Sequence, residues 1–253
     1  MRKIASVALL NFKQAIRDRI FLGVIFFFVF FLAFCALLGK LSPGETGKVL
    51  RNAGLAGIEL SALILVVFSL TFSFYREKDS RMLEIYLSNF SRTAYISGKL
   101  GGYLLISVFY LALSAIGYIL LLCFYGAFLW QPIIGLYPLF LKLSIIVGFC
   151  LVFSCLFSSP VIALLSSLSL YFASETAYPA LKVIGLEAGE VKVFLFKCLY
   201  YLLPNMNKLD IKSLAIYGRL PELSFFLLIS LYSFGYILFL WLIARFIFTR
   251  REY

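Results

Sequence analysis

Charged side chains interrupt this apolar chain at two places where their types and spacing suggest chemistry. The first is a polar insert at residues 74–105, FYREKDSRMLEIYLSNFSRTAYISGKLGGYLL. If residues 77–88 form a helix, polar side chains share one face at helical spacing: Glu77, Arg81, Glu84 and Ser88. The other face is mainly apolar: Met82, Leu83, Tyr86 and Leu87. This pattern is typical of a surface helix that docks a soluble partner, and equally of a solvated loop with local salt bridges.

The second place is Glu59, a carboxylate within an apolar run. An ionised carboxylate in the lipid interior is unfavourable by about 2.5 kcal/mol or more. Glu59 is therefore expected either to face a substrate path or another helix, or to lie close enough to the external membrane surface to reach water. Glu175, near the outer end of a later apolar run, has the same two explanations.

Several classes of enzyme are disfavoured by residues and motifs that the sequence lacks. The chain has no histidine, which removes imidazole as a base or as a ligand to metal or haem. Its five cysteines lie in or beside apolar segments without a CxxC pair, as small buried hydrophobes do. The stretch GETGKVL at residues 44–50 lacks the glycine spacing and the hydroxyl of a phosphate-binding loop. We therefore expect no catalytic residue, metal or cofactor site in this chain.

The elements that must position these residues follow from the composition. The chain is 63% hydrophobic and 14% charged, whereas soluble domains are roughly 45–50% apolar and 25% charged. Apolar runs of about 20 residues are long enough to cross a hydrocarbon core as helices. The predicted fold is an all-α polytopic membrane protein, a single transmembrane domain over residues 1–253. We place its six transmembrane helices at about 20–39, 53–74, 100–124, 139–157, 160–178 and 225–248.

The basic residues indicate a membrane topology. A net charge of +11 suggests nucleic acid in a soluble chain, but here Lys and Arg cluster beside the apolar spans. We expect the lipid bilayer as a partner, and no nucleic acid. Six spans return the C-terminus to the side of the N-terminus, and that side collects thirteen of the 23 basic residues. Both termini are therefore expected in the cytoplasm.

Two further segments are expected to lie at the membrane surface. Over residues 1–19, apolar residues step by four along one stripe: Ile4, Ala8, Phe12 and Ile16. This spacing predicts an N-terminal amphipathic interfacial helix. Residues 179–224 contain VKVFLFKCLYYLLP, which Lys197 interrupts and which is too short for a seventh span. We expect this external segment to form a re-entrant or interfacial helical cap before the last span.

The polar insert resembles the cytoplasmic segment after the second span of ABC-2 type transporter permeases. In that family an acidic residue precedes a short helix, a Leu-rich stretch, an Arg, an aromatic residue and a Gly-Lys pair. The residues in those places here are Glu77, Leu83, Leu87, Arg92, Tyr95, Gly98 and Lys99. NFKQAIRDRIFLGVIFF at the N-terminus and LYYLLPNMNKLDI before the last span extend the resemblance over nearly the whole chain. The chain departs from the pattern at Asn89-Phe90, where many members have a proline, and at SRMLE.

This resemblance implies the permease subunit of an ATP-binding cassette exporter in the cell membrane, the inner or plasma membrane of a bacterium. It implies pairing with a second permease subunit, identical or homologous, and a separate ATPase subunit that hydrolyses ATP in trans. Residues 75–99 would be the cytoplasmic coupling segment. The residues expected to dock the ATPase are Glu77, Arg81, Met82, Leu83, Glu84, Leu87 and Arg92.

Three alternatives remain open at this stage. A proton- or ion-coupled transporter or a channel would use Glu59 as its titrating group. A non-transporting membrane scaffold would have stable partners without nucleotide-dependent movement. An intramembrane enzyme is disfavoured by the absence of histidine and of hydrolase motifs. The sequence does not select a substrate.

Overall fold

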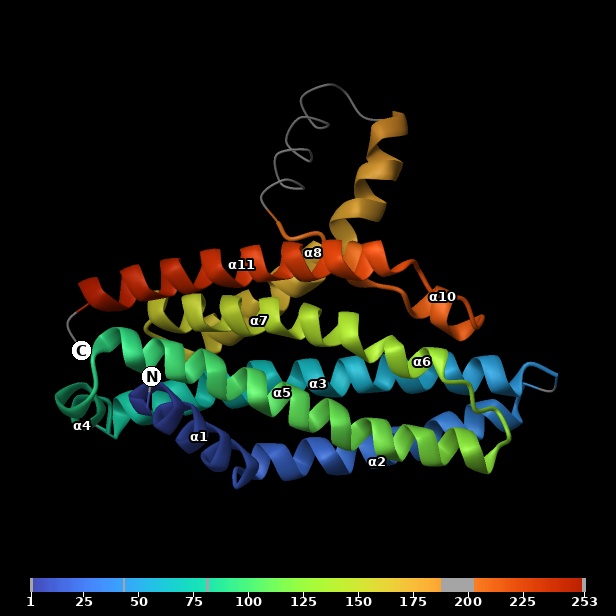
Figure 1. Ribbon diagram of the computed structural model, residues 1–253, viewed down its shortest axis with the longest axis horizontal. Helices are drawn as coiled ribbons and strands as arrows, with labels where there is room; N and C mark the ends of the chain where they lie inside the picture. The colour runs from blue at the N-terminus through green and yellow to red at the C-terminus, as the bar shows by residue number, and fades with distance from the viewer. Residues whose placement is uncertain (1, 43, 81, 188–202, 252–253) are drawn as a thin grey trace.

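The apolar runs of the sequence fold as long helices. The computed structural model describes residues 2–42, 44–80, 82–187 and 203–251, which form helices and turns and no strand (Figure 1). Along the chain the elements are α1 (Arg2–Ile16), α2 (Arg19–Lys40), α3 (Thr46–Asp79), α4 (Met82–Asn89), α5 (Arg92–Phe124), α6 (Gln131–Ile134), α7 (Leu136–Leu156), α8 (Pro160–Glu187), the 3₁₀-helix η1 (Met206–Leu209), α10 (Lys212–Ile216) and α11 (Leu223–Arg250).

Five of these stretches are long and apolar enough to cross a membrane: α2, α3, α5, the combined α6–α7 stretch and α11. The prediction of an all-α polytopic membrane protein is therefore confirmed. The predicted spans 20–39, 139–157 and 225–248 agree with α2, α7 and α11 to within a few residues. The predicted span 160–178 corresponds to the first part of α8, whose side chains are described only as far as Thr176 and which is not among the five.

The second and third spans are longer than predicted. α3 has 34 residues and α5 has 33, so both helices extend beyond the roughly 20 residues that a bilayer requires. The predicted coupling segment 75–99 therefore includes the end of α3 and the start of α5, and only residues 80–91 connect the two helices. Within this polar stretch, Glu77 of α3 and Lys99 of α5 form an ion pair inside the bundle.

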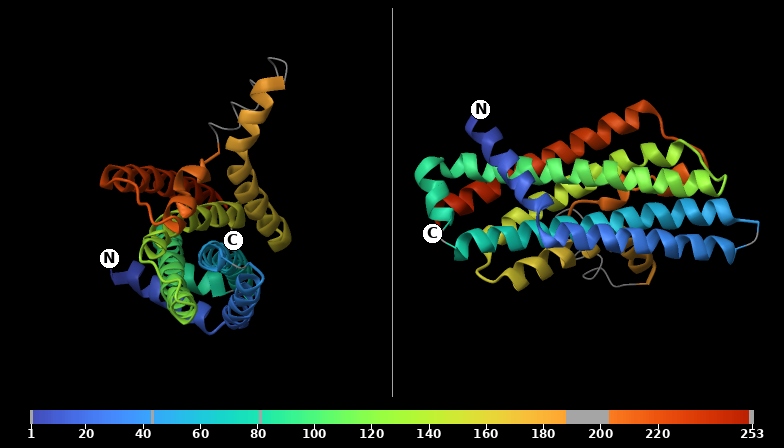
Figure 2. Two further views of the ribbon diagram at one scale, coloured as in Figure 1. Left: turned by 90° about the vertical axis from the view of Figure 1, so that its right-hand side faces the viewer. Right: turned by 90° about the horizontal axis from the view of Figure 1, so that it is seen from below.

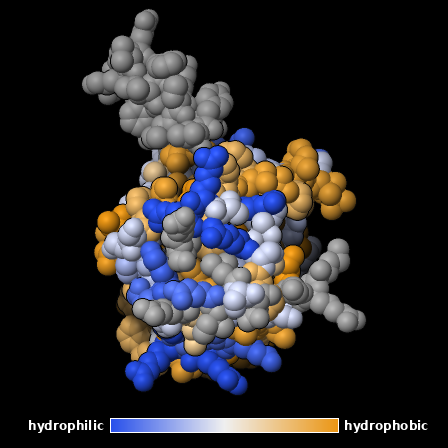
Figure 3. Space-filling view, turned by 90° about the vertical axis from the view of Figure 1, so that its left-hand side faces the viewer, coloured by the Kyte–Doolittle hydropathy of each residue, from blue (hydrophilic) through white to orange (hydrophobic). Residues whose placement is uncertain are grey.

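Both chain termini lie at one end of the bundle (Figure 1). We call this the proximal end; it contains Asp79, Arg92 and Arg250, and the opposite, distal end contains Lys40 and Thr46. The proximal end is seen face on in Figure 3, with hydrophilic side chains spread across it.

The helices differ in how far they are buried. α3 and α7 are central, with roughly three quarters of their most apolar windows buried, whereas α2 and α11 expose most of theirs. On α2, for example, Phe26 is 76% and Phe30 is 68% exposed. Large exposed apolar side chains on outer helices are the surface that lipid covers in a membrane protein. The polar functional groups are therefore expected between α3 and its neighbours.

α8 leaves the bundle partway along its length. Viewed along the long axis of the bundle in the left panel of Figure 2, its C-terminal part projects away from the other helices. Residues 188–202, which hold most of the stretch VKVFLFKCLYYLLP of the predicted cap, including Lys197, lie outside the described residues. The chain is described again from Leu203, where η1 packs against α7 and α8, and α10 packs against α3 and α6.

The N-terminal amphipathic helix is confirmed as α1, which packs against α5. Glycines of α5 allow the two backbones to approach closely. A Cβ on Gly98 would lie 2.6 Å from Val7, and one on Gly102 would lie 2.9 Å from the carbonyl oxygen of Ala8. α1 buries Val7 and Ala8 in this contact and leaves Leu9 50% exposed, as expected of a helix at a membrane surface.

Candidate functional site

The polar insert does not form the single helix predicted over residues 77–88. α3 ends at Asp79, Ser80 follows as its C-cap, and α4 begins only at Met82. Glu77 therefore belongs to the last turns of α3, whereas Glu84 belongs to α4. Arg81 and the side chain of Leu87, both predicted to dock an ATPase, lie outside the described residues.

Glu77 points into the bundle instead of toward solvent, which corrects its predicted place on an exposed docking face. Its carboxylate is 2% exposed and lies 2.8 Å from the ammonium of Lys99, which is fully buried. The hydroxyl of Tyr95 donates to the same carboxylate at 2.5 Å, and that of Ser73 donates at 3.0 Å. A buried charge persists only when it is paired and its remaining lone pairs are satisfied. Glu77 is thus a structural link between α3 and α5.

The exposed part of the insert is α4. Met82 is 51% exposed, and Glu84 and Ser88 are exposed, whereas Leu83 is 2% exposed and fixes the helix to the bundle. The ring of Tyr86 lies 6.0 Å from that of Tyr95, the residue that binds Glu77. Burial and the negative charge of Glu77 raise the pKa of the Tyr86 phenol. α4 therefore offers a small charged and apolar surface backed directly by the buried ion pair.

Arg92, the last of the predicted docking residues, contacts α11 instead of facing outward. Its guanidinium donates to the carbonyl oxygens of Thr249 at 2.8 Å and of Arg251 at 2.9 Å. The last carbonyl groups of a helix lack intrahelical partners and carry partial negative charge, so a cation is stabilising there. The geometry assigns Arg92 to capping the C-terminus of α11.

A second ion network lies toward the distal end around Glu59, which is 6% exposed. One oxygen of its carboxylate, Oε1, is 2.6 Å from the ammonium of Lys142 on α7 and accepts from the hydroxyl of Tyr171 on α8 at 2.9 Å. Lys142 also pairs with Glu175 at 2.6 Å. Glu59 thus faces α7 and α8 inside the bundle.

The other oxygen of Glu59, Oε2, pairs with the ammonium of Lys212. Lys212 is the first residue of α10, outside the membrane-crossing helices, and its ammonium is also 3.5 Å from Asp210. Burial lowers the pKa of Lys212, but the carboxylates of Glu59 and Asp210 outweigh burial, so the pKa is raised. The network thus runs from the distal surface into the bundle as alternating charges: Asp210, Lys212, Glu59, Lys142 and Glu175.

A polar groove of about 580 Å³ opens beside this network. Asp210, Lys212 and Ser213 line it from one side, and Glu45 and Asn52 contribute from the start of α3. Because Lys212 both lines the groove and contacts Glu59, the groove ends at the buried network.

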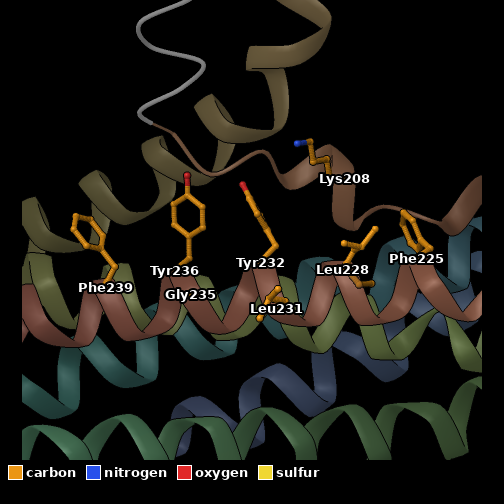
Figure 4. Close-up of a pocket in the computed structure, with 9 residues that line it drawn as sticks. Lys208, Phe225, Leu228, Leu231, Tyr232, Gly235, Tyr236 and Phe239 are labelled. Carbon is orange, nitrogen blue, oxygen red and sulfur yellow. The ribbon is translucent and has the colours of Figure 1, made fainter.

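An apolar groove of about 910 Å³ runs along one face of α11. Tyr232 and Tyr236 point from that helix toward the side on which Lys208 lies (Figure 4). Lys208 is the one charged side chain among the described residues of its lining. A surface of this kind is normally covered by lipid or by another membrane helix.

Sequence reasoning missed several members of the two networks, among them Lys142, Tyr171 and Lys212. Lys142 lies three residues inside its predicted span, and Tyr171 and Lys212 carried no motif. A lysine within an apolar run is as costly as the acid at Glu59 and implies a buried counter-charge. That signal identifies Lys142 as a partner for an intramembrane carboxylate, but not which one.

Comparison with known proteins adds no identification. A scan against protein-family models gives no match, and a search of curated proteins finds no similar sequence. Within the described ranges, no group of three or more Cys, Asp and Glu side chains is arranged to hold a metal ion.

Proposed function

We propose that this chain is the permease subunit of an ATP-binding cassette exporter, driven by a separate ATPase subunit. The observation that carries the proposal is the continuous path from the exposed surface of α4 to the buried pair of Glu77 and Lys99. Tyr86 of α4 contacts Tyr95, Tyr95 binds Glu77, and Glu77 holds Lys99 of α5. A partner that moves α4 would therefore move the ends of two membrane helices.

The path also reaches the last membrane helix. The ring of Tyr95 stacks on that of Phe248 of α11 at 5.4 Å, and the ring of Phe74 of α3 lies 6.4 Å from that of Phe248. Three helices that cross the membrane thus meet directly behind one short exposed helix. This arrangement suits a docking element that transmits force, since packed rings and ion pairs shift as units and do not deform continuously.

In this proposal the proximal end faces the cytoplasm of the cell, where ATP is available. Exposed basic side chains on this end, including Lys13, Arg17 and Arg76, agree with the positive-inside rule. α1 would lie on the inner leaflet beside α4, and both helices would contact the ATPase. A second permease subunit would complete the transport pathway, and the exported substrate is unidentified.

The proposal is tested by affinity purification of the tagged full chain from its native membrane in mild detergent, followed by mass spectrometry and an ATPase assay. We expect an ABC ATPase to co-purify with the wild-type chain. Charge changes on the exposed face of α4, Met82→Glu with Glu84→Lys, should abolish co-purification while the chain stays folded. Lys40→Glu, a charge reversal on an exposed residue at the distal end, is the matched control and should retain the ATPase.

Two outcomes contradict different parts of the proposal. If the ATPase remains bound to the Met82→Glu/Glu84→Lys chain, α4 is not the docking surface. If no ATPase accompanies the wild-type chain from membranes that yield other intact complexes, the exporter assignment is wrong.

A second candidate function is ion-coupled transport, which the Glu59 network favours. Ionisable residues inside membrane proteins frequently mark ion and proton paths. This function predicts a gradient-dependent flux that persists without any ATPase and that Glu59→Gln abolishes. A flux that stops when the ATPase is removed excludes it.

A further inference from the structure

The two oxygens of the Glu59 carboxylate bind partners from different parts of the molecule. Oε1 is held by Lys142 and Tyr171, which belong to the helices α7 and α8. Oε2 is held by Lys212 of α10, a helix of five residues outside the membrane-crossing helices. Movement of α10 alone would free Oε2 and leave the contacts of Oε1 intact.

Removal of Lys212 would leave an excess of negative charge inside the bundle. Glu59 and Glu175 would then share the single ammonium of Lys142, and Glu59 is 6% exposed. An uncompensated buried charge is strongly unfavourable, so this position favours either a cation in place of the Lys212 ammonium or protonation of a carboxylate. The same excess charge excludes an anion from this position.

Lys212 already has an alternative partner. Its ammonium is 3.5 Å from Asp210, which lies in the same segment and whose carboxylate accepts from the Lys212 backbone N–H at 2.9 Å. When α10 moves, the ammonium of Lys212 can leave Glu59 and still pair with the carboxylate of Asp210. The movement of α10 away from Glu59 is therefore an exchange of one ion pair for another.

The polar groove gives a solute access to this position. Its volume of about 580 Å³ falls within the roughly 300–1,000 Å³ of small-molecule sites. Lys212 itself shows which group fits at its inner end, namely a primary ammonium on an unbranched alkyl chain.

We propose that Oε2 of Glu59 binds the primary ammonium group of a cationic solute, and that Lys212 occupies this place while α10 is packed against the bundle. This inference rests on the proposed function in so far as the solute would be the exported substrate. The side chain of Lys212 then acts as a tethered competitor, and α10 moves away when the solute replaces it.

The binding site is tested with propylammonium chloride as the probe and the purified full chain in detergent. Lys212→Ala should lower the midpoint of thermal unfolding, and propylammonium should restore about half or more of that loss, because a ligand that binds only the folded state stabilises it. Tetramethylammonium chloride and sodium chloride at equal ionic strength should restore none of it, since neither offers an N–H donor. Glu59→Gln/Lys212→Ala should not respond to propylammonium.

Lys208→Ala is the matched control, because Lys208 lies four residues away, is exposed and contacts the ring of Tyr232. It should show no response to propylammonium. Equal recovery of Lys212→Ala by sodium or tetramethylammonium would overturn the proposal, as would recovery that persists without the Glu59 carboxylate.

A second measurement uses the wild-type chain and does not depend on the folding of Lys212→Ala. In the co-purified complex with its ATPase, propylammonium should increase ATP hydrolysis; Glu59→Gln should remove the increase, and Lys208→Ala, the matched control, should keep it. If an ATPase co-purifies but propylammonium has no effect on hydrolysis, this inference fails and the exporter assignment stands. If none co-purifies, the exporter assignment fails while recovery of Lys212→Ala still decides the site.

Discussion

Replacing Lys99 with methionine tests whether the ion pair at the proximal end holds α3 and α5 together. Lys99 is fully buried, and its ammonium lies 2.8 Å from the carboxylate of Glu77, which is 2% exposed. Methionine keeps an unbranched apolar side chain and removes the charge. Glu77 would then retain two hydroxyl donors, Ser73 and Tyr95, and no counter-charge.

The magnitude follows from this geometry. Removing one partner of a buried ion pair destabilises a protein by about 3–5 kcal/mol, because the other charge stays buried and unpaired. Since the two hydroxyl donors remain, we expect a loss of about 3 kcal/mol, at the lower end of that range. Glu77→Gln combined with Lys99→Met leaves no buried charge, so the double variant should lose less than Lys99→Met alone.

Unfolding in mixed micelles with increasing denaturing detergent, followed by tryptophan fluorescence, measures these differences. Trp241 reports on this end, because its indole N–H donates to the hydroxyl of Ser97 at 3.0 Å, two residues from Lys99. Lys13→Met, at an exposed position on α1, is the control and should stay within about 0.5 kcal/mol of the wild type. A loss below about 1 kcal/mol for Lys99→Met, or additive effects in the double variant, would refute the reasoning.

Three further predictions concern the capping, packing and titration of other residues. Arg92→Gln removes the cation bound to the carbonyl oxygens at the end of α11, including that of Thr249 at 2.8 Å; it should cost about 1–2 kcal/mol and speed amide exchange in the last turn of α11. Gly102→Val should displace α1 and reduce cysteine cross-linking between α1 and α5, because a Cβ there would lie 2.9 Å from a backbone oxygen. Gly101→Ala, whose Cβ would have its nearest contact at 3.7 Å, is the control and should cross-link like the wild type. The raised pKa of Lys212 means that its contribution to stability is complete below the ordinary value of 10.5 and is lost as pH rises through the higher folded value. The difference in unfolding free energy between wild type and Lys212→Ala should therefore be constant from about pH 7 to 9 and shrink above 10.5, and a difference that shrinks below pH 9 would contradict this.

Hydropathy along the chain was sufficient to predict the fold class and most of the long helices. α2, α7 and α11 match their predicted spans because a run of apolar side chains both favours helix and determines its length in lipid. The same reasoning placed both ends of α3 and the start of α5 too far inside the helices, whereas the end of α5 at Phe124 agrees. A charged residue such as Glu77 lowers the hydropathy of its segment, so the predicted span ends before it. In the folded chain, Lys99 neutralises that charge.

The ion networks could be predicted only in part, because their members are distant in sequence. Glu59 was identified as a candidate because an ionised carboxylate is unfavourable in the lipid interior. Its partner Lys142, however, lies 83 residues away in the sequence. Lys99 was expected beside the membrane as part of the cytoplasmic positive charge, and it is fully buried. Residue type reveals that a buried charge requires compensation, whereas only the packing of the helices reveals which residue supplies it.

The positions of the two networks on α3 connect the proximal and distal sites. Glu59 and Glu77 are 18 residues apart, which is five turns of helix, so they share one face about 27 Å apart. This separation is close to the roughly 30 Å thickness of a hydrocarbon core. Each carboxylate binds a lysine of a neighbouring helix, Lys142 on α7 and Lys99 on α5. Rotation of α3 or sliding along its axis would break both pairs at once, whereas a tilt of α3 together with α5 and α7 preserves them. We therefore expect α3 to move as one rigid helix, so that a displacement of α4 is transmitted along α3 to Glu59.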